Sequence, residues 1–176
     1  MTALLPILCY CRKKFFGERM VDLSGVVTPF IRPGETVLVV GRAGRKFLRA
    51  IECAVGKNGY LFTALQEVKK RGSTRPVLLP RRIHVNSPGN SGTPEAIADL
   101  VICIRMTGVV PAEGELIQEI HAAMRPAGTL MICEPVWRIR KRQFNGMLSV
   151  AEEQGFIGRP GPAVPGYHTA LMVRIC

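Results

Sequence analysis

The 176-residue sequence lacks the cysteine spacing of a metal cluster or a disulfide framework. Its six cysteines include no C-x-x-C pair, and Cys103 and Cys133 fall inside apolar runs that predict buried strands. We therefore expect no bound metal and reduced thiols, as in a cytoplasmic protein. The sequence also has no solenoid repeats and no low-complexity tract, so one domain with its own core is expected from its length.

Acidic residues are scarce, because 13 Asp and Glu stand against 24 Lys and Arg and leave a net charge of +11. This balance favours an anionic partner. No helix-turn-helix, zinc-finger or RNA-recognition signature accompanies it, so nucleic acid stays open as a partner without a motif. The apolar start, Met1 to Cys11, is too short to cross a bilayer. Residues 1–20, with the basic cluster at 12–14, predict either a segment that binds a membrane surface or a helix packed on the core.

The most informative stretch covers residues 37–47, where four apolar residues are followed by a turn of small residues and then by an amphipathic pattern. An apolar run without alternation is typical of a strand that is covered on both faces. Phe47 and Ile51 lie on one stripe of the following helix. The stretch predicts a βαβ unit, whose first turn binds nucleotide-like ligands, and it directs the search for function to Gly41 and Gly44.

The rest of the chain repeats this alternation of strands and helices. The pattern predicts an α/β fold with an N-terminal helical segment at 1–30, packed on or beside the core, and one domain at 31–176. Strands are expected near residues 36–40, 60–64, 82–86, 99–104, 129–133 and 168–175. Four helices are expected. The first follows Gly44 and carries the apolar stripe, the second has about two turns and ends near Gly72, the third runs from about 112 to 124, and the fourth covers 143–154.

Four local phrases carry a resemblance to a known family over roughly residues 30–175. They are Arg32-Pro33-Gly34-Glu35-Thr36-Val37-Leu38, Asp99-Leu100-Val101-Ile102, Met124-Arg125-Pro126-Ala127-Gly128-Thr129-Leu130 and Gly155-Phe156. In these phrases and in the order of elements the chain resembles the class I S-adenosylmethionine-dependent methyltransferases, particularly the quinone and small-molecule group. The resemblance implies a Rossmann-like methyltransferase fold, with a seven-stranded, mostly parallel sheet, a reversed last strand and helices on both faces.

The resemblance also implies where the cofactor S-adenosylmethionine would bind. The cofactor-binding residues that it predicts are Gly41, Ala43, Gly44, Gln66, Asn86 and Ile104. The sequence departs from the family's turn, which usually has an acid where this chain has Val39 and glycines where it has Ala43 and Arg45. The acid that usually binds the ribose hydroxyls is replaced by Leu65. Loss of such a contact costs roughly 1.5–3 kcal/mol, so weak or absent cofactor binding is expected.

Candidate substrate residues follow the fifth strand. Glu134 ends that strand as a possible substrate contact or a cap on neighbouring backbone, and Trp137 with Arg138 offers a ring beside a cation. The basic run 138–142 either binds an anionic substrate or is a solvated loop. The sequence also lacks an Asn-Pro-Pro-aromatic run after the fourth strand, which in the resembling enzymes holds an amino group, so methylation of a base nitrogen is disfavoured.

No catalytic residue is predicted. The three histidines, His84, His121 and His168, are candidate general bases, although each is more simply explained as a boundary or surface residue. Two functions therefore remain open. One is an S-adenosylmethionine-dependent methyltransferase of a small or ring-bearing substrate, and the other is a catalytically inactive methyltransferase-fold subunit that binds an anionic partner.

Overall fold

The computed structural model describes residues 22–66, 78–82, 97–106 and 113–175. Its elements are α2 (Ser24–Val27), the short 3-10 helix η1 (Thr28–Phe30), β1 (Thr36–Gly41), α3 (Arg45–Val55), β2 (Tyr60–Gln66), β3 (Leu78–Arg82), β4 (Ala98–Ile104), α4 (Glu113–Ala123), β5 (Met124–Pro135), α5 (Lys141–Glu153), β6 (Phe156–Arg159) and β7 (Tyr167–Arg174).

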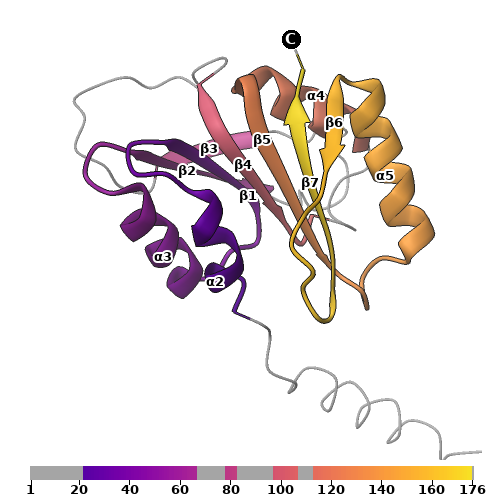
Figure 1. Ribbon diagram of the computed structural model, residues 1–176, viewed down its shortest axis with the longest axis horizontal. Helices are drawn as coiled ribbons and strands as arrows, with labels where there is room; N and C mark the ends of the chain where they lie inside the picture. The colour runs from indigo at the N-terminus through magenta and orange to yellow at the C-terminus, as the bar shows by residue number, and fades with distance from the viewer. Residues whose placement is uncertain (1–21, 67–77, 83–96, 107–112, 176) are drawn as a thin grey trace, which may run out of the picture.

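All seven strands belong to one sheet, in the order β3-β2-β1-β4-β5-β7-β6 (Figure 1). β1 lies between β2 and β4 and is parallel to both, and β4 is parallel to β5. β7 runs antiparallel to its neighbours β5 and β6. The predicted fold class, a mostly parallel sheet with a reversed last strand, is confirmed.

Helices cover both faces of the sheet, and Figure 1 shows α3 and α5 on opposite sides. On one face, α3 packs Ile51 against Val37 and Ile102 of the central strands. On the other face, α4 and α5 pack against the residues between these, such as Val101. Because successive side chains of a strand point to opposite faces, a strand buried on both sides needs an unbroken apolar run, and every residue of β1 is buried.

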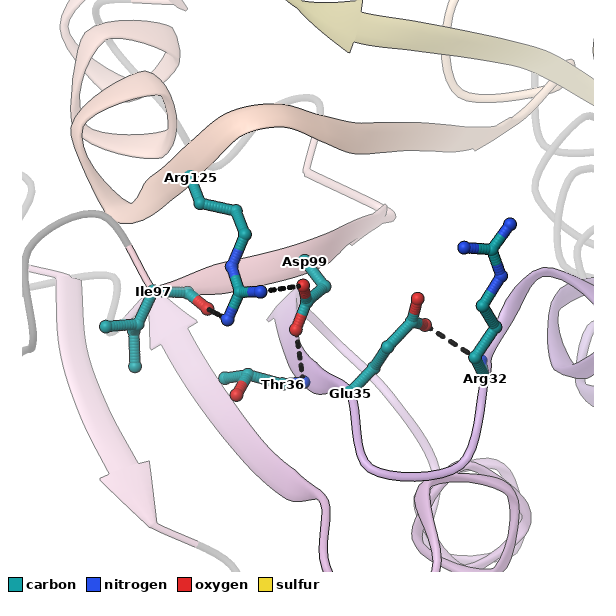
Figure 2. A network of polar contacts seen from close by, with 6 residues as sticks. All are labelled: Arg32, Glu35, Thr36, Ile97, Asp99 and Arg125. Atoms are coloured by element: carbon teal, nitrogen blue, oxygen red, sulfur yellow. Dashed lines mark hydrogen bonds and ion pairs between the residues drawn. The ribbon is translucent and has the colours of Figure 1, made fainter.

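At the edge of the sheet where the parallel strands begin, one carboxylate joins three strands (Figure 2). Asp99 of β4 accepts a hydrogen bond from the backbone N–H of Thr36 on β1 (2.8 Å) and pairs with the guanidinium of Arg125 on β5 (2.7 Å). Arg125 also reaches the carbonyl oxygen of Ile97, at 3.5 Å. We call Thr36, Asp99 and Arg125 the strand-start clamp, because it fixes β1, β4 and β5 relative to one another.

Three elements differ from the sequence-based prediction. β6 was not predicted, and β5 begins at Met124 rather than near 129, because its first residue pairs with Ala98 before an irregularity in the register. The third strand begins at Leu78 and is antiparallel to β2, a direction that the sequence did not indicate. The rest of the predicted third strand, 83–86, and the predicted two-turn helix ending near Gly72 lie outside the described residues.

The described part of the N-terminal segment packs on the core. Leu23, Val27 and Ile31 are buried in the same apolar cluster as α3. Residues 1–21, for which a membrane-surface segment was one prediction, lie outside the described residues. Among the helices that are described, none is long and apolar enough to pass through a bilayer.

Candidate functional site

The turn after β1 requires a glycine at its first position. Gly41 has a φ of 104°, in the left-handed region, and a methyl group added to it would overlap the carbonyl oxygen of Ile104 at the end of β4. The next residue, Arg42, donates its backbone N–H to that same oxygen, at 3.2 Å. The turn therefore holds the ends of β1 and β4 in contact.

The same turn leads into the N-terminus of α3. Gly44 is the N-cap of this helix, with an ordinary φ of −80°, and no side chain caps the first backbone N–H groups. A helix start of this kind carries a partial positive charge and free donors, which favour an anionic group. Arg45, the first helical residue and one of the two positions where the family's turn usually has glycine, is exposed and does not line the adjoining pocket.

A pocket of about 240 Å³ opens beside this turn. Its walls come from the segment before α2, the turn, the first turn of α3 and the end of β4, and its lining residues are Asp22, Leu23, Arg42, Ala43, Gly44, Lys46, Phe47, Ile104 and Arg105. We call it the turn pocket. In the observed strand order β1 and β4 are the strands where the order reverses, and ligands of open α/β sheets bind beyond the carboxyl ends of such strands.

The charges of the turn pocket are mostly positive. Arg42, Lys46 and Arg105 contribute three cations, while Asp22 is the one acid among the lining residues. Asp22 lies 3.3 Å from the Lys46 ammonium, and both side chains are largely exposed. Hydrogen bonds from Ser24 lower the pKa of Asp22, and Lys46 lowers it further, so the carboxylate stays ionised.

The structure brings together four of the six residues predicted to bind the cofactor. Ala43, Gly44 and Ile104 line the turn pocket, and Gly41 lies directly against the backbone of Ile104 at the strand end. Gln66 is the last residue of β2, where its backbone pairs with Leu78 of β3, and Leu65 precedes it. Asn86 lies outside the described residues. Their contact with a cofactor stays a prediction.

Glu134 is fully buried near the end of β5. Its carboxylate accepts a hydrogen bond from the backbone N–H of Met106, just beyond the end of β4. It therefore ties two strand ends together, which corresponds to the capping role that was the alternative to substrate contact. Burial raises the pKa of the neighbouring Cys133 thiol to about 12, and the charge of Glu134 adds to this effect.

Trp137 and Arg138 follow at the surface. The Trp137 side chain is 59% exposed, and the guanidinium carbon of Arg138 lies 5.8 Å from the centre of its ring. This distance is typical of a cation–π contact. The predicted pairing of a ring with a cation is therefore present in the structure, although contact with a substrate remains a prediction.

The histidines lie in different places. His121, on α4, packs edge-on against Phe156 at 5.4 Å between ring centres, and burial together with the charge of Arg174 lowers its pKa. His168 stacks on Phe144 at 5.3 Å. His84 lies outside the described residues. Neither of the two described histidines lines the turn pocket.

Sequence reasoning missed the charged residues of the turn pocket. Arg42 and Lys46 flank the small residues of the turn, and this was the available signal, since side chains beside a ligand-binding turn are placed to meet the ligand. Asp22 carried no signal, because it is far from the turn in sequence and reaches it only through the packing of α2 on α3.

Comparison with solved structures identifies the fold. A S-adenosylmethionine-dependent methyltransferase from Aquifex aeolicus superposes with a TM-score of 0.65 at 16% identity, over 93% of this chain and 96% of the other. An S-adenosylmethionine-dependent O-methyltransferase from Thermotoga maritima gives 0.56 at 13% identity, over 93% of this chain and 70% of the other. A 16S rRNA (adenine(1408)-N(1))-methyltransferase from Catenulisporales acidiphilia gives 0.52 at 12% identity, over 91% and 94%.

No protein-family model and no curated protein matches the sequence. The structural likeness nevertheless agrees with the resemblance found in the four sequence phrases. The chain has the fold of the class I S-adenosylmethionine-dependent methyltransferases.

Proposed function

We propose that this protein is an S-adenosylmethionine-dependent methyltransferase that acts on a small or ring-bearing substrate and binds its cofactor weakly. The observation that carries the proposal is the position of the turn pocket, at the carboxyl ends of β1 and β4 where the strand order reverses. Three solved structures with this fold are methyltransferases by name, which supports the same reading.

The lining of the turn pocket fits one end of the cofactor. Lys46 and the free N–H groups at the start of α3 suit the carboxylate of its methionine part, and Asp22 suits the ammonium group. Pockets for whole ligands of this size usually have about 300–1,000 Å³, so a pocket of about 240 Å³ receives only part of the molecule. The rest would extend toward the end of β2, where Leu65 replaces the usual acid.

When bound, the cofactor supplies a methyl group on a positively charged sulfur, already activated for transfer to a nucleophile. What remains for the chain is to hold donor and acceptor in line and to keep water away. This explains why no catalytic acid or base is required by the geometry.

Calorimetry with S-adenosylmethionine tests the proposal. We expect wild-type binding no tighter than about tens of micromolar, since one charge-assisted pair of hydrogen bonds is lost. Leu65→Asp should tighten binding roughly tenfold, because a strand-end carboxylate would accept hydrogen bonds from both ribose hydroxyls. Leu65→Asn is the matched control, with the same shape and no charge, and should gain less.

Two results would count against the proposal. Submicromolar binding by the unaltered protein would show that the site is not weakened. No heat with either wild type or Leu65→Asp would remove cofactor binding altogether and would favour the inactive, partner-binding subunit.

A further inference from the structure

One side of β7 is left open by the described helices. Leu171 pairs with the buried Met131 of β5 and packs against the apolar cluster of α3, so it points to the side of the sheet on which α3 lies. The residues on this side are Tyr167, Thr169, Leu171, Val173 and, just after the strand, Ile175. None of them is buried. We call these residues, together with Ile157 of β6, the β7 face.

The β7 face is apolar although it is open to solvent. Ile157 is 48% exposed and Ile175 is 46% exposed, and Val173 pairs with Ile157 on β6. A strand with one solvated side normally alternates apolar and polar residues. β7 departs from this pattern, because Met172 is buried on one side while Leu171 and Val173 are apolar on the other. Such a patch is typical of a surface that binds another segment or molecule.

The described helices lie elsewhere. Figure 1 shows α2 and α3 beside β1 and β2, away from β6 and β7. α5 contacts β7 from the other side, where Phe144 stacks on His168. Phe30 of η1 is 37% exposed and lines a cavity with Leu171, at the border of the β7 face. Within the described part of the chain, the apolar packing under α2 and η1 thus continues onto the β7 face and is not covered there.

We propose that the segment before Asp22, residues 1–21, folds back and covers the β7 face. This segment has an apolar stretch at 3–11 and two adjacent aromatic residues, Phe15 and Phe16. The stretch is too short to cross a bilayer, and apolar side chains gain free energy when they leave water. Packing the segment on the β7 face removes both apolar surfaces from water at once.

The length of the segment and its junction with the described chain allow this packing. Leu23 is buried in the apolar cluster against which Tyr167 and Leu171 pack, so the chain leaves the described residues on the same side of the sheet. From Tyr167 to Ile175 the face is about 27 Å long at the usual rise of a strand, and 21 residues span roughly 30 Å even as a helix. Because Asp22 lines the turn pocket, a docked segment would also fix one wall of that pocket.

Charge at one end of the β7 face also suits the segment. Glu152 and Glu153 are the only acids between residues 135 and 176, and both are exposed at the end of α5. Gly155 follows closely, and its carbonyl oxygen accepts a hydrogen bond from the N–H of Ile175, at 2.9 Å. The two carboxylates therefore lie near the end of the face. The cations at 12–14 separate the two apolar parts of the segment, and opposite charges at this border favour one orientation of it.

Limited trypsin cleavage tests the proposal, because residues 12–14 are three consecutive trypsin sites. In the full chain we expect slow cleavage there, since a docked segment must leave the face before the protease can bind it. Ile157→Arg places a charge on the face and should speed this cleavage about tenfold. Ile157 is half exposed on a short edge strand, so the variant should stay folded, which an unchanged cleavage pattern after residue 21 would verify.

Val136→Arg is the matched control. Val136 is 47% exposed but follows β5 at the opposite end of the parallel strands, so the same charge there should leave cleavage at 12–14 unchanged. Crosslinking then locates the segment. With a short bismaleimide, Val173→Cys should be joined to Cys9 or Cys11 of the same chain. Ser149→Cys, exposed on α5, should not be joined to them.

The packing does not rest on the proposed methyl transfer, because the β7 face shares no residue with the turn pocket. Equal cleavage rates at 12–14 in wild type and Ile157→Arg would overturn it. So would a dimer in light scattering that Ile157→Arg converts to a monomer, which assigns the face to a second copy. Binding of the wild type to phosphatidylserine vesicles that Ile157→Arg leaves unchanged, without the Val173→Cys crosslink, would assign the segment to a membrane surface instead.

Discussion

Charged residues are arranged differently at the two ends of the parallel strands. At the edge where the parallel strands begin, Asp99 binds Thr36 and Arg125 in the strand-start clamp, so its charge is matched by partners on both sides (Figure 2). At the edge where they end, three cations and one acid line the turn pocket. The first arrangement stabilises the sheet, whereas the second places an excess of positive charge beside the turn pocket.

Backbone strain is present at both edges. We call the end of the sheet with the strand-start clamp the clamp edge and the end with the turn pocket the ligand edge. Arg105, which follows β4 at the ligand edge, has a φ of 53°, and Ala127, at the clamp edge, has a φ of 60°. Neither is glycine. The comparison therefore predicts that strain at the clamp edge can be relieved without loss of function, while changes at the ligand edge affect binding as well as stability.

The largest effect is expected for Gly41→Ala. The added methyl group would overlap the Ile104 carbonyl at a left-handed φ, so β1 and β4 must separate, at a cost of about 3–5 kcal/mol in the free energy of unfolding. Denaturant unfolding measures it. Gly44→Ala is the matched control three residues later, with ordinary φ and open space around it, and should cost at most about 1 kcal/mol, the difference between glycine and alanine at an N-cap. Equal losses from both would contradict the close contact.

Asp99→Ala should have the next largest effect. It leaves the buried N–H of Thr36 without its acceptor and Arg125 without its carboxylate, which costs about 2–3 kcal/mol. Asp99→Asn keeps an acceptor for Thr36 and should cost less. At the ligand edge, Asp22→Ala removes an exposed carboxylate and should change stability far less. A larger loss for Asp22→Ala than for Asp99→Ala would reverse the comparison.

The third effect is a change in the free energy of unfolding that occurs only at high pH. The Cys133 pKa is about 12 in the folded protein against an ordinary 9.0, so the folded state keeps a proton that the unfolded chain releases. This contribution is complete below pH 9 and is lost as the pH rises toward 12, by up to about 1.4 kcal/mol per pH unit. Cys133→Ala should therefore reduce the decline in unfolding free energy between pH 9 and 12. Parallel profiles for the two proteins would exclude this thiol as a cause.

The smallest effect is expected for Ala127→Gly. Glycine adopts a φ of 60° without strain but loses more entropy on folding, so the net gain is about 0.5 kcal/mol. A rise in the denaturation midpoint with unchanged cofactor affinity would agree with a purely structural edge. A change in affinity would show that the two edges are coupled.

The sequence predicted the elements that are buried and whose burial is visible as a continuous apolar run. β1, β4 and the centre of β5 are such runs, and Phe47 with Ile51 marked the buried face of α3. β6 was missed because only Phe156 of its four residues is buried, which leaves no pattern to detect. The direction of β3 depends on the path of the chain after Gln66, and local sequence does not encode that path.

The candidate site was predictable to a similar degree. Gly41 was identified because a strand followed by a tight turn restricts the choice of residue. The Asp99 clamp and the contribution of Asp22 to the turn pocket join residues that are distant along the chain. Such partners follow from topology, so they appear only when the strands are placed side by side.

The outer strands of the sheet bear on aggregation. Among the described residues these are β3 and β6, whose outer edges are not paired with another strand. β3 contains Pro80, which pairs with Ala64. Because proline has no backbone N–H, it cannot donate a hydrogen bond to a strand of another molecule. β6 has only four residues, ends at Arg159 and is followed by Pro160. Both edges are thus poor templates for a further strand, which protects a sheet rich in valine and isoleucine from joining other copies into fibres.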